Sequence, residues 1–214
     1  MRFFVEREIA NFCYYLDTLE QTLNAKKQEV SKNVDMADTE LGNFGYDDLK
    51  RKELIYLKVE SEQLMGFSNL LRQSFLTSLY SFMELWLLRE CYLDSKRRDS
   101  GNSYNEFKKD TGIIKVKRYH QKVLQSNFSF DTNKEWLWLN NLRLLRDCIV
   151  HKQGSLTGFS DFEANPILKS FVQNESGLSL IGVDNNQIFV DHDFCLKALE
   201  TIHRFMLEFL SLKT

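Results

Sequence analysis

A single proline, Pro166, occurs among the 214 residues of this chain, together with only nine glycines. Proline and glycine are the residues that most often end or interrupt helices, so their scarcity favours long helices with few breaks. The same count excludes collagenous, proline-rich and many-turn all-β folds. Hydrophobic residues make up 43% of the chain, which is enough to fill a sizeable core. We therefore predict a mostly α-helical protein, a helical bundle.

The net charge of −2 does not create the basic field over a whole chain that is typical of nucleic-acid-binding proteins. The charge is segregated, because residues 1–60 are acidic on balance whereas residues 95–125 carry an excess of Lys and Arg. The four cysteines are scattered and form no CxxC pair, which is typical of reduced thiols in the cytosol. The first residues have no signal-peptide pattern, and charges interrupt the most apolar segment, 75–93. We expect a soluble cytoplasmic protein with no membrane partner.

Residues 3–31 have the apolar spacing of one long helix. A narrow apolar seam follows steps of three, four and seven residues: Val5, Ile9, Phe12, Leu16, Leu19, Leu23 and Val30. Such a seam packs against another helix, either in a second copy or next in the same chain. Residues 33–48, with Gly42 and Gly45, break the pattern and predict a polar loop. Acidic residues at 47 and 48 indicate that a second helix begins there.

From Leu49 the helical pattern continues almost to Arg98, with an interruption expected near Gly66. Between residues 70 and 93 this helix is apolar on most faces, which is typical of a helix in the centre of a bundle. A strip of small residues predicts a place where another helix approaches closely: Ser74, Ser78 and Ser81. We expect two units, an N-terminal helical extension over 1–60 that resembles a coiled-coil hairpin and a helical domain over 61–214.

The second half of the chain predicts further helices and one hairpin. Asp131 or Thr132 is expected to cap a helix that runs to about Val150. Pro166 is expected in a loop after this helix, where the bundle stops. Strand-like residues on both sides of 184–186 predict a small C-terminal β-hairpin. The segment Asp191-His192-Asp193 precedes a last amphipathic helix, and capping between strand and helix explains it better than a metal site.

The segment RDCIVHKQG at residues 146–154 combines an arginine, an acid and a histidine at the end of a helix. Asp147 and His151 are four residues apart, so they lie on one face, where Asp147 can orient the imidazole. Arg143 extends the same ridge by another turn. Arg146 lies about 140° from His151 around an ideal helix. These two converge only if the last turn loosens or a second subunit completes the site.

This segment resembles the R-x(4–6)-H signature of the HEPN superfamily. Arg146 and His151 match its two ends, and Asp147 stands at the position that is often polar in the family. The context is similar too: a hydrophobic helix with Glu84 precedes the motif helix, and a hairpin and a final helix follow. The resemblance covers residues 64–214. It implies a homodimer through the motif helices and, in catalytic members, a metal-independent endoribonuclease.

The resemblance also implies roles for the residues and for the protein. Arg146 binds phosphate and stabilises the transition state, His151 transfers protons, and Asp147 orients His151. Cleavage by the 2′-OH of RNA leaves a 2′,3′-cyclic phosphate. Such enzymes are frequent toxins or phage-defence effectors, so an antitoxin or a defence protein is an expected partner besides RNA. The sequence contains no Walker, GxGxxG, HExxH or GxSxG motif, and we expect no cofactor and no metal.

Cations of the basic run at 115–122 and of the motif helix are candidates for holding the RNA backbone: Lys115, Lys117, Arg118, Arg143 and Lys152. A solvated helix face explains the run at 115–122 equally well. His151 also fits a plain helix C-cap, where a cation is favoured. Two non-enzymatic alternatives therefore stay open: an RNA-binding or protein-interaction module of the HEPN type, and a dimeric scaffold that pairs through residues 5–30.

Overall fold

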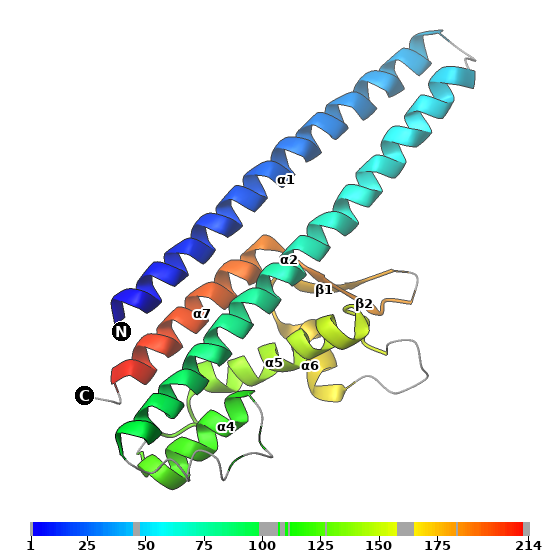
Figure 1. Cartoon of the computed structure of the whole chain (residues 1–214). Coiled ribbons are helices and arrows are strands. Elements are labelled where there is room, and N and C mark those ends of the chain that lie inside the picture. Colours follow the sequence, from blue (N-terminus) through cyan, green and yellow to red (C-terminus); the bar gives the residue numbers. More distant parts are fainter. Residues whose placement is uncertain are drawn as a thin grey trace.

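The computed structural model describes residues 2–44, 48–98, 107, 110, 112–126, 128–157, 165–182 and 184–211. The described chain is mostly α-helical with one small antiparallel hairpin, which confirms the predicted fold class (Figure 1). Its elements in chain order are α1 (Arg2–Phe44), α2 (Asp48–Arg97), α4 (Gly112–Tyr119), the π-helical turn η1 (His120–Leu124), α5 (Lys134–Lys152), α6 (Pro166–Asn174), β1 (Leu178–Ile181), β2 (Gln187–Val190) and α7 (His192–Ser211). None of the described helices is long and apolar enough to cross a membrane.

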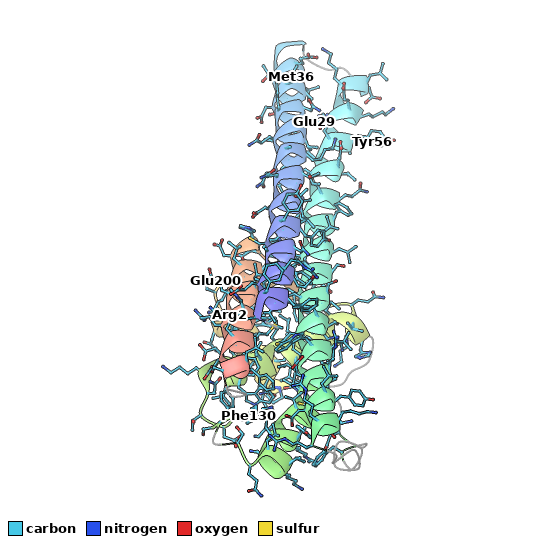
Figure 2. The ribbon with its side chains drawn as sticks, turned by 60° about the vertical axis from the view of Figure 1, so that its left-hand side comes forward. Arg2, Glu29, Met36, Tyr56, Phe130 and Glu200 are labelled. Carbon is cyan, nitrogen blue, oxygen red and sulfur yellow. The ribbon has the colours of Figure 1, made fainter. Side chains whose placement is uncertain are left out.

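Helices α1 and α2 form a long antiparallel pair whose far ends project beyond the other helices (Figure 1). Met36 and Tyr56 lie on the projecting part (Figure 2). The seam of α1 packs within its own chain, against α2 and α7. Its buried members are Val5, Ile9, Leu16, Leu19, Leu23 and Val30.

The predicted polar loop over 33–48 is wrong, because α1 continues as a helix to Phe44. Gly42 has open space around it, so in α1 it costs about 1 kcal/mol of helix propensity without ending the helix. A hydrogen-bonded ion pair between Lys50 Nζ and Glu40 Oε2, at 3.0 Å, joins the last turns of α1 to the start of α2. Residues 45–47 of the predicted loop lie outside the described residues. Helix α2 begins at Asp48 as expected, and it runs without interruption through Gly66 and through residue 60.

The middle of α2 lies in the centre of the bundle, as its apolar sequence predicts. Phe75, Leu79 and Met83 are fully buried between α1, α5 and α7. Rings from α4–η1, α5 and α7 close the lower end of the core around Phe130, whose position Figure 2 marks. The first part of the α1 seam (Val5, Ile9 and Leu16), the middle of α2 and the face of α7 therefore share one hydrophobic core.

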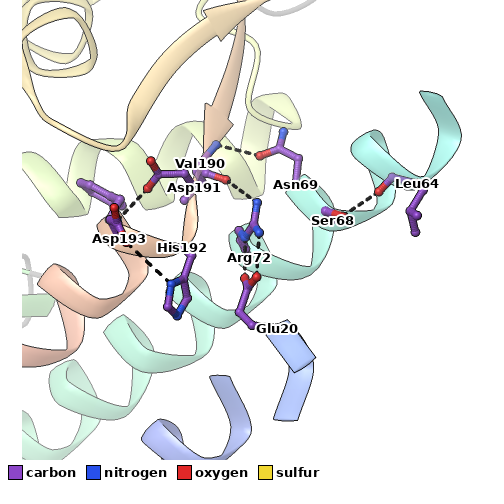
Figure 3. Close-up of polar contacts among 10 residues, drawn as sticks. Glu20, Leu64, Ser68, Asn69, Arg72, Val190, Asp191, His192 and Asp193 are labelled. Carbon is purple, nitrogen blue, oxygen red and sulfur yellow. Dashed lines mark hydrogen bonds and ion pairs between the residues drawn. The ribbon is translucent and has the colours of Figure 1, made fainter. Parts of the chain in front are cut away.

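Polar side chains of α2 hold the hairpin in place (Figure 3). The Asn69 amide donates to the carbonyl of Ile188 at 3.0 Å and accepts from the amide of Val190 at 2.9 Å. Gln73 donates to the same carbonyl of Ile188 at 3.0 Å. Strand β2 thus uses α2 as a partner on one side and pairs with β1 on the other, with Leu178 opposite Val190.

Two predicted boundaries in the second half need correction. The N-cap of α5 is Asn133, and neither Asp131 nor Thr132, since Asn133 Oδ1 accepts the amide of Trp136 at 2.8 Å. Pro166 does not lie in a loop but begins α6, with Asn165 as its cap. Proline is favoured in the first helical turn, where its missing N–H leaves no hydrogen bond unmade.

Candidate functional site

The candidate residues Arg143, Arg146, Asp147 and His151 all lie on the second half of α5. This helix is regular until its cap at Gln153, which has a φ of 53° and whose amide bonds Cys148 O. Gly154 follows with a φ of +76°, a conformation that favours glycine. The backbone then pairs with the hairpin, because Ile188 N donates to Gly154 O at 2.9 Å. The end of the motif helix is therefore held against β2.

Asp147 is bridged by two arginines. Its carboxylate accepts from Arg143 Nη1 at 3.2 Å and from Arg146 Nη1 at 3.0 Å. The three side chains are between 26% and 36% exposed, so the cluster is half-buried. The Nε atoms of both arginines are buried, and they have no hydrogen-bond partner among the described residues. The remaining exposed parts of the two arginine side chains are where an additional anionic group can approach.

Glu84 of α2 faces this cluster from the neighbouring helix. Burial raises the pKa of Glu84, the charge of Arg146 opposes that rise, and the charge of Asp147 adds to it, so that the pKa lies above its ordinary value. The backbone N–H of Ile113 donates to the Glu84 carboxylate at the start of α4. Gly112, with a φ of +57°, lies so close that a Cβ there would be 2.2 Å from Glu84 Oε1. The first turn of α4 thus cradles this carboxylate.

Tyr80 lies one turn before Glu84 on α2 and is fully buried. Its hydroxyl has no hydrogen-bond partner in the part of the chain that the structure describes. Burial and the nearby Glu84 charge raise the pKa of Tyr80 far above its ordinary value, so the phenol stays neutral. The motif alone did not indicate Tyr80, Gly112 or Ile113, because their link to α5 runs through Glu84 and tertiary packing.

His151 is exposed in the last turn of α5. The described residues provide no hydrogen bond between His151 and Asp147, whose carboxylate is directed to the arginines. Since α5 stays regular through Lys152, its last turn does not loosen, and Arg146 and His151 of one chain keep different faces. The two side chains therefore do not converge within one chain.

The predicted RNA-binding cations lie in two places. On α4, Lys117 forms an ion pair with Asp131 at 2.5 Å, and Arg118 forms one with Asp110 at 2.7 Å. Lys115 is half-buried on the same helix. On α5, Lys152 Nζ approaches Leu156 O at 3.5 Å, beside the motif. The α4 cations are therefore already partly neutralised by acids of their own chain.

A groove of about 640 Å³ runs between α2 and the end of α5 and reaches the hairpin. Ser74 and Ser78 of α2 line one wall, and Ile149 and Gln153 of α5 line the other. No group of three or more His, Cys, Asp or Glu residues in the described ranges is placed to hold a metal ion. The groove and the arginine cluster are both formed where α2 passes α5.

Comparison with known proteins gives no match to a family model, to a curated protein or to a solved structure. The resemblance to the HEPN superfamily stays a prediction from the Arg146–His151 motif and its helical context.

Proposed function

We propose that the chain is a metal-independent endoribonuclease of the HEPN type, with Arg146 and His151 as its catalytic residues. The observation that carries the proposal is the partly exposed pair of arginines on the helix that presents an exposed histidine in its last turn. Guanidinium groups bind phosphate oxygens through planar, permanently charged forks. An imidazole exchanges protons near neutral pH. Helix α5 carries one group of each kind, Arg146 and His151.

The reaction uses the nucleophile that RNA itself carries. The 2′-oxygen attacks the adjacent phosphorus and the bond to the 5′-oxygen breaks, which leaves a 2′,3′-cyclic phosphate and a 5′-hydroxyl. His151 transfers the proton that leaves the 2′-hydroxyl or the one that reaches the 5′-oxygen, an effect worth about 10²–10⁴-fold in rate. Arg146 stabilises the charge that builds on the phosphate oxygens.

A homodimer supplies the geometry that one chain lacks. Arg146 and His151 point about 140° apart on a regular helix, so they do not face one phosphate within one chain. In the proposed dimer, Arg146 of one copy and His151 of the other act on the same phosphate. Asp147 serves as a positioning residue for Arg143 and Arg146 through its two ion pairs.

The chemistry of the substrate gives the test. Purified protein in EDTA is expected to cut single-stranded RNA and to leave 2′,3′-cyclic phosphate ends. An oligonucleotide of the same sequence with deoxyribose throughout is expected to stay intact, because it lacks the attacking hydroxyl. Cleavage of the deoxy strand, or loss of RNA cleavage in EDTA, contradicts the proposal.

A non-catalytic RNA-binding or protein-interaction module of the same type is the second candidate. It is favoured by the orientation of Asp147, which bonds two arginines instead of orienting His151. This candidate predicts RNA binding without cleavage that weakens as salt increases. Replacing Lys115, Lys117 and Arg118 by Ala would then weaken binding and reduce its salt dependence, whereas His151→Ala would change neither.

A further inference from the structure

Helix α2 carries an exposed face on the side opposite to its buried residues. This outer stripe follows steps of three, four, seven and eight residues, which keep to one face of a helix. Its apolar members are between 43% and 77% exposed, and Tyr56 points away from α1 (Figure 2). The outer stripe consists of Leu49, Tyr56, Val59, Phe67, Leu70, Ser74, Ser78, Ser81, Leu85 and Tyr92.

Large side chains occupy the outer stripe up to Leu70, and the three serines follow them in its middle. Leu70 and Phe67 lie just before Ser74, and they are 61% and 52% exposed. Ser78 and Ser81 lie at matching distances just after it. We propose that two copies of the chain pair antiparallel through their outer stripes, with the two-fold axis beside Ser74.

Antiparallel pairing makes the two stripes complementary in size. It places Leu70 of one copy over Ser78 of the partner subunit, and Phe67 over Ser81 of the partner subunit. Parallel pairing would instead set serine against serine and leave gaps between the larger side chains. Dense packing without voids favours the antiparallel arrangement.

An acid and a base beside the stripe lie nearly symmetric about the same point. Glu53 and Lys96 are equally far from the bond between residues 74 and 75, and both are exposed. Antiparallel pairing about this point brings Glu53 opposite Lys96 of the partner subunit. The two-fold axis repeats this pair. Parallel pairing would place each of these charges opposite its own copy, and charges beside a helical seam select orientation in this way.

The length of the contact suits a stable dimer. From Tyr56 to Tyr92 the helix extends about 54 Å at 1.5 Å per residue. A contact of this length can bury the roughly 800 Å² per partner that stable dimers need. The axis beside Ser74 also borders the groove that Ile149 and Gln153 line at the end of α5. This pairing goes beyond the proposed nuclease and does not depend on it.

A charge swap tests the orientation. The dimer dissociation constant of the full chain is measured by sedimentation over a dilution series. Lys96→Glu and Glu53→Lys are each expected to raise it about tenfold, and the double variant is expected to return it to near the parent value. Leu70→Glu is expected to leave the chain monomeric with an unchanged circular dichroism melt, since Leu70 is 61% exposed. A monomeric parent chain, or a double variant no better than the singles, overturns the proposal.

Cross-linking tests the position of the axis in a Cys13→Ser background, since the other cysteines are buried. Ser74→Cys lies beside the axis and is expected to form a covalent dimer with a short bis-maleimide. Leu85→Cys is the matched control, because antiparallel pairing holds its two copies about 30 Å apart along the helices. A parallel dimer would cross-link through Leu85→Cys as well as through Ser74→Cys, so cross-linking through Leu85→Cys contradicts the proposal.

Discussion

Arg72 and Glu20 form a buried two-point ion pair that joins α2 to α1. Arg72 Nε lies 2.6 Å from Glu20 Oε1, and Arg72 Nη2 lies 2.8 Å from Glu20 Oε2. The side chains are only 7% and 9% exposed. Arg72 Nη1 also donates to the carbonyl of Val190 at 3.4 Å, so one guanidinium connects α1, α2 and the hairpin (Figure 3).

Breaking this pair from one side is expected to be costly. Arg72→Met leaves the Glu20 charge buried without its partner, which we expect to lower the free energy of unfolding by about 3–5 kcal/mol. The double variant Arg72→Met with Glu20→Leu is expected to lose less, because no charge stays buried. Urea denaturation of both variants measures the difference. A double variant less stable than Arg72→Met would show that the pair is not the source of the cost.

Glu84 predicts a dependence of stability on pH. Its pKa in the folded chain is raised, so the stability it contributes is present below its ordinary value of 4.5 and is lost as the pH rises through the folded pKa. Glu84→Gln is therefore expected to melt at a higher temperature than the parent chain at pH 7. The gap is expected to close below pH 4.5. Equal melting temperatures at pH 7 would contradict the raised pKa, and the exposed Glu62→Gln is the control.

Replacement by alanine is expected to have opposite effects on stability at Gly112 and at Gly66. Gly112→Ala forces alanine into a φ of +57° and into contact with Glu84, and we expect a loss of about 1–3 kcal/mol. Gly66→Ala is the matched control, since Gly66 lies inside α2 with open space around it and should gain about 0.5–1 kcal/mol. Chemical denaturation measures both. A neutral Gly112→Ala would show that the first turn of α4 does not depend on this glycine.

Elements that rest on local periodicity were predictable from the sequence. The seam of α1 is buried because steps of three and four residues return to one helix face. The hairpin has strands at 178–181 and 187–190 because its turn residues are unambiguous. The segment 191–193 provides the expected cap of α7, since Asp191 Oδ1 accepts the amide of Phe194 at 2.9 Å. The extension of α1 past residue 33 was missed because an exposed glycine weakens a helix without ending it.

The site was predictable only as a motif. The spacing of Arg146 and His151 was visible in the chain, but the partners of Asp147 were not, since two arginines on one ridge compete with the histidine for one carboxylate. Nor did the sequence indicate that Gly112 cradles Glu84, because tertiary packing brings α4 to α2. Asn69 and Arg72 are polar residues at positions where the helical pattern of α2 expects buried apolar ones, and this was the available signal that they make buried polar contacts.

The most direct test of the proposed function is the rate of RNA cleavage in EDTA by the parent chain and by matched variants. Arg146→Ala and His151→Ala are each expected to lower the rate at least about 100-fold while the circular dichroism melt stays unchanged. Arg204→Ala and His203→Ala on α7 are the controls and are expected to cleave at the parent rate. Cleavage by Arg146→Ala and His151→Ala at the parent rate would contradict the assignment of Arg146 and His151 as the catalytic residues.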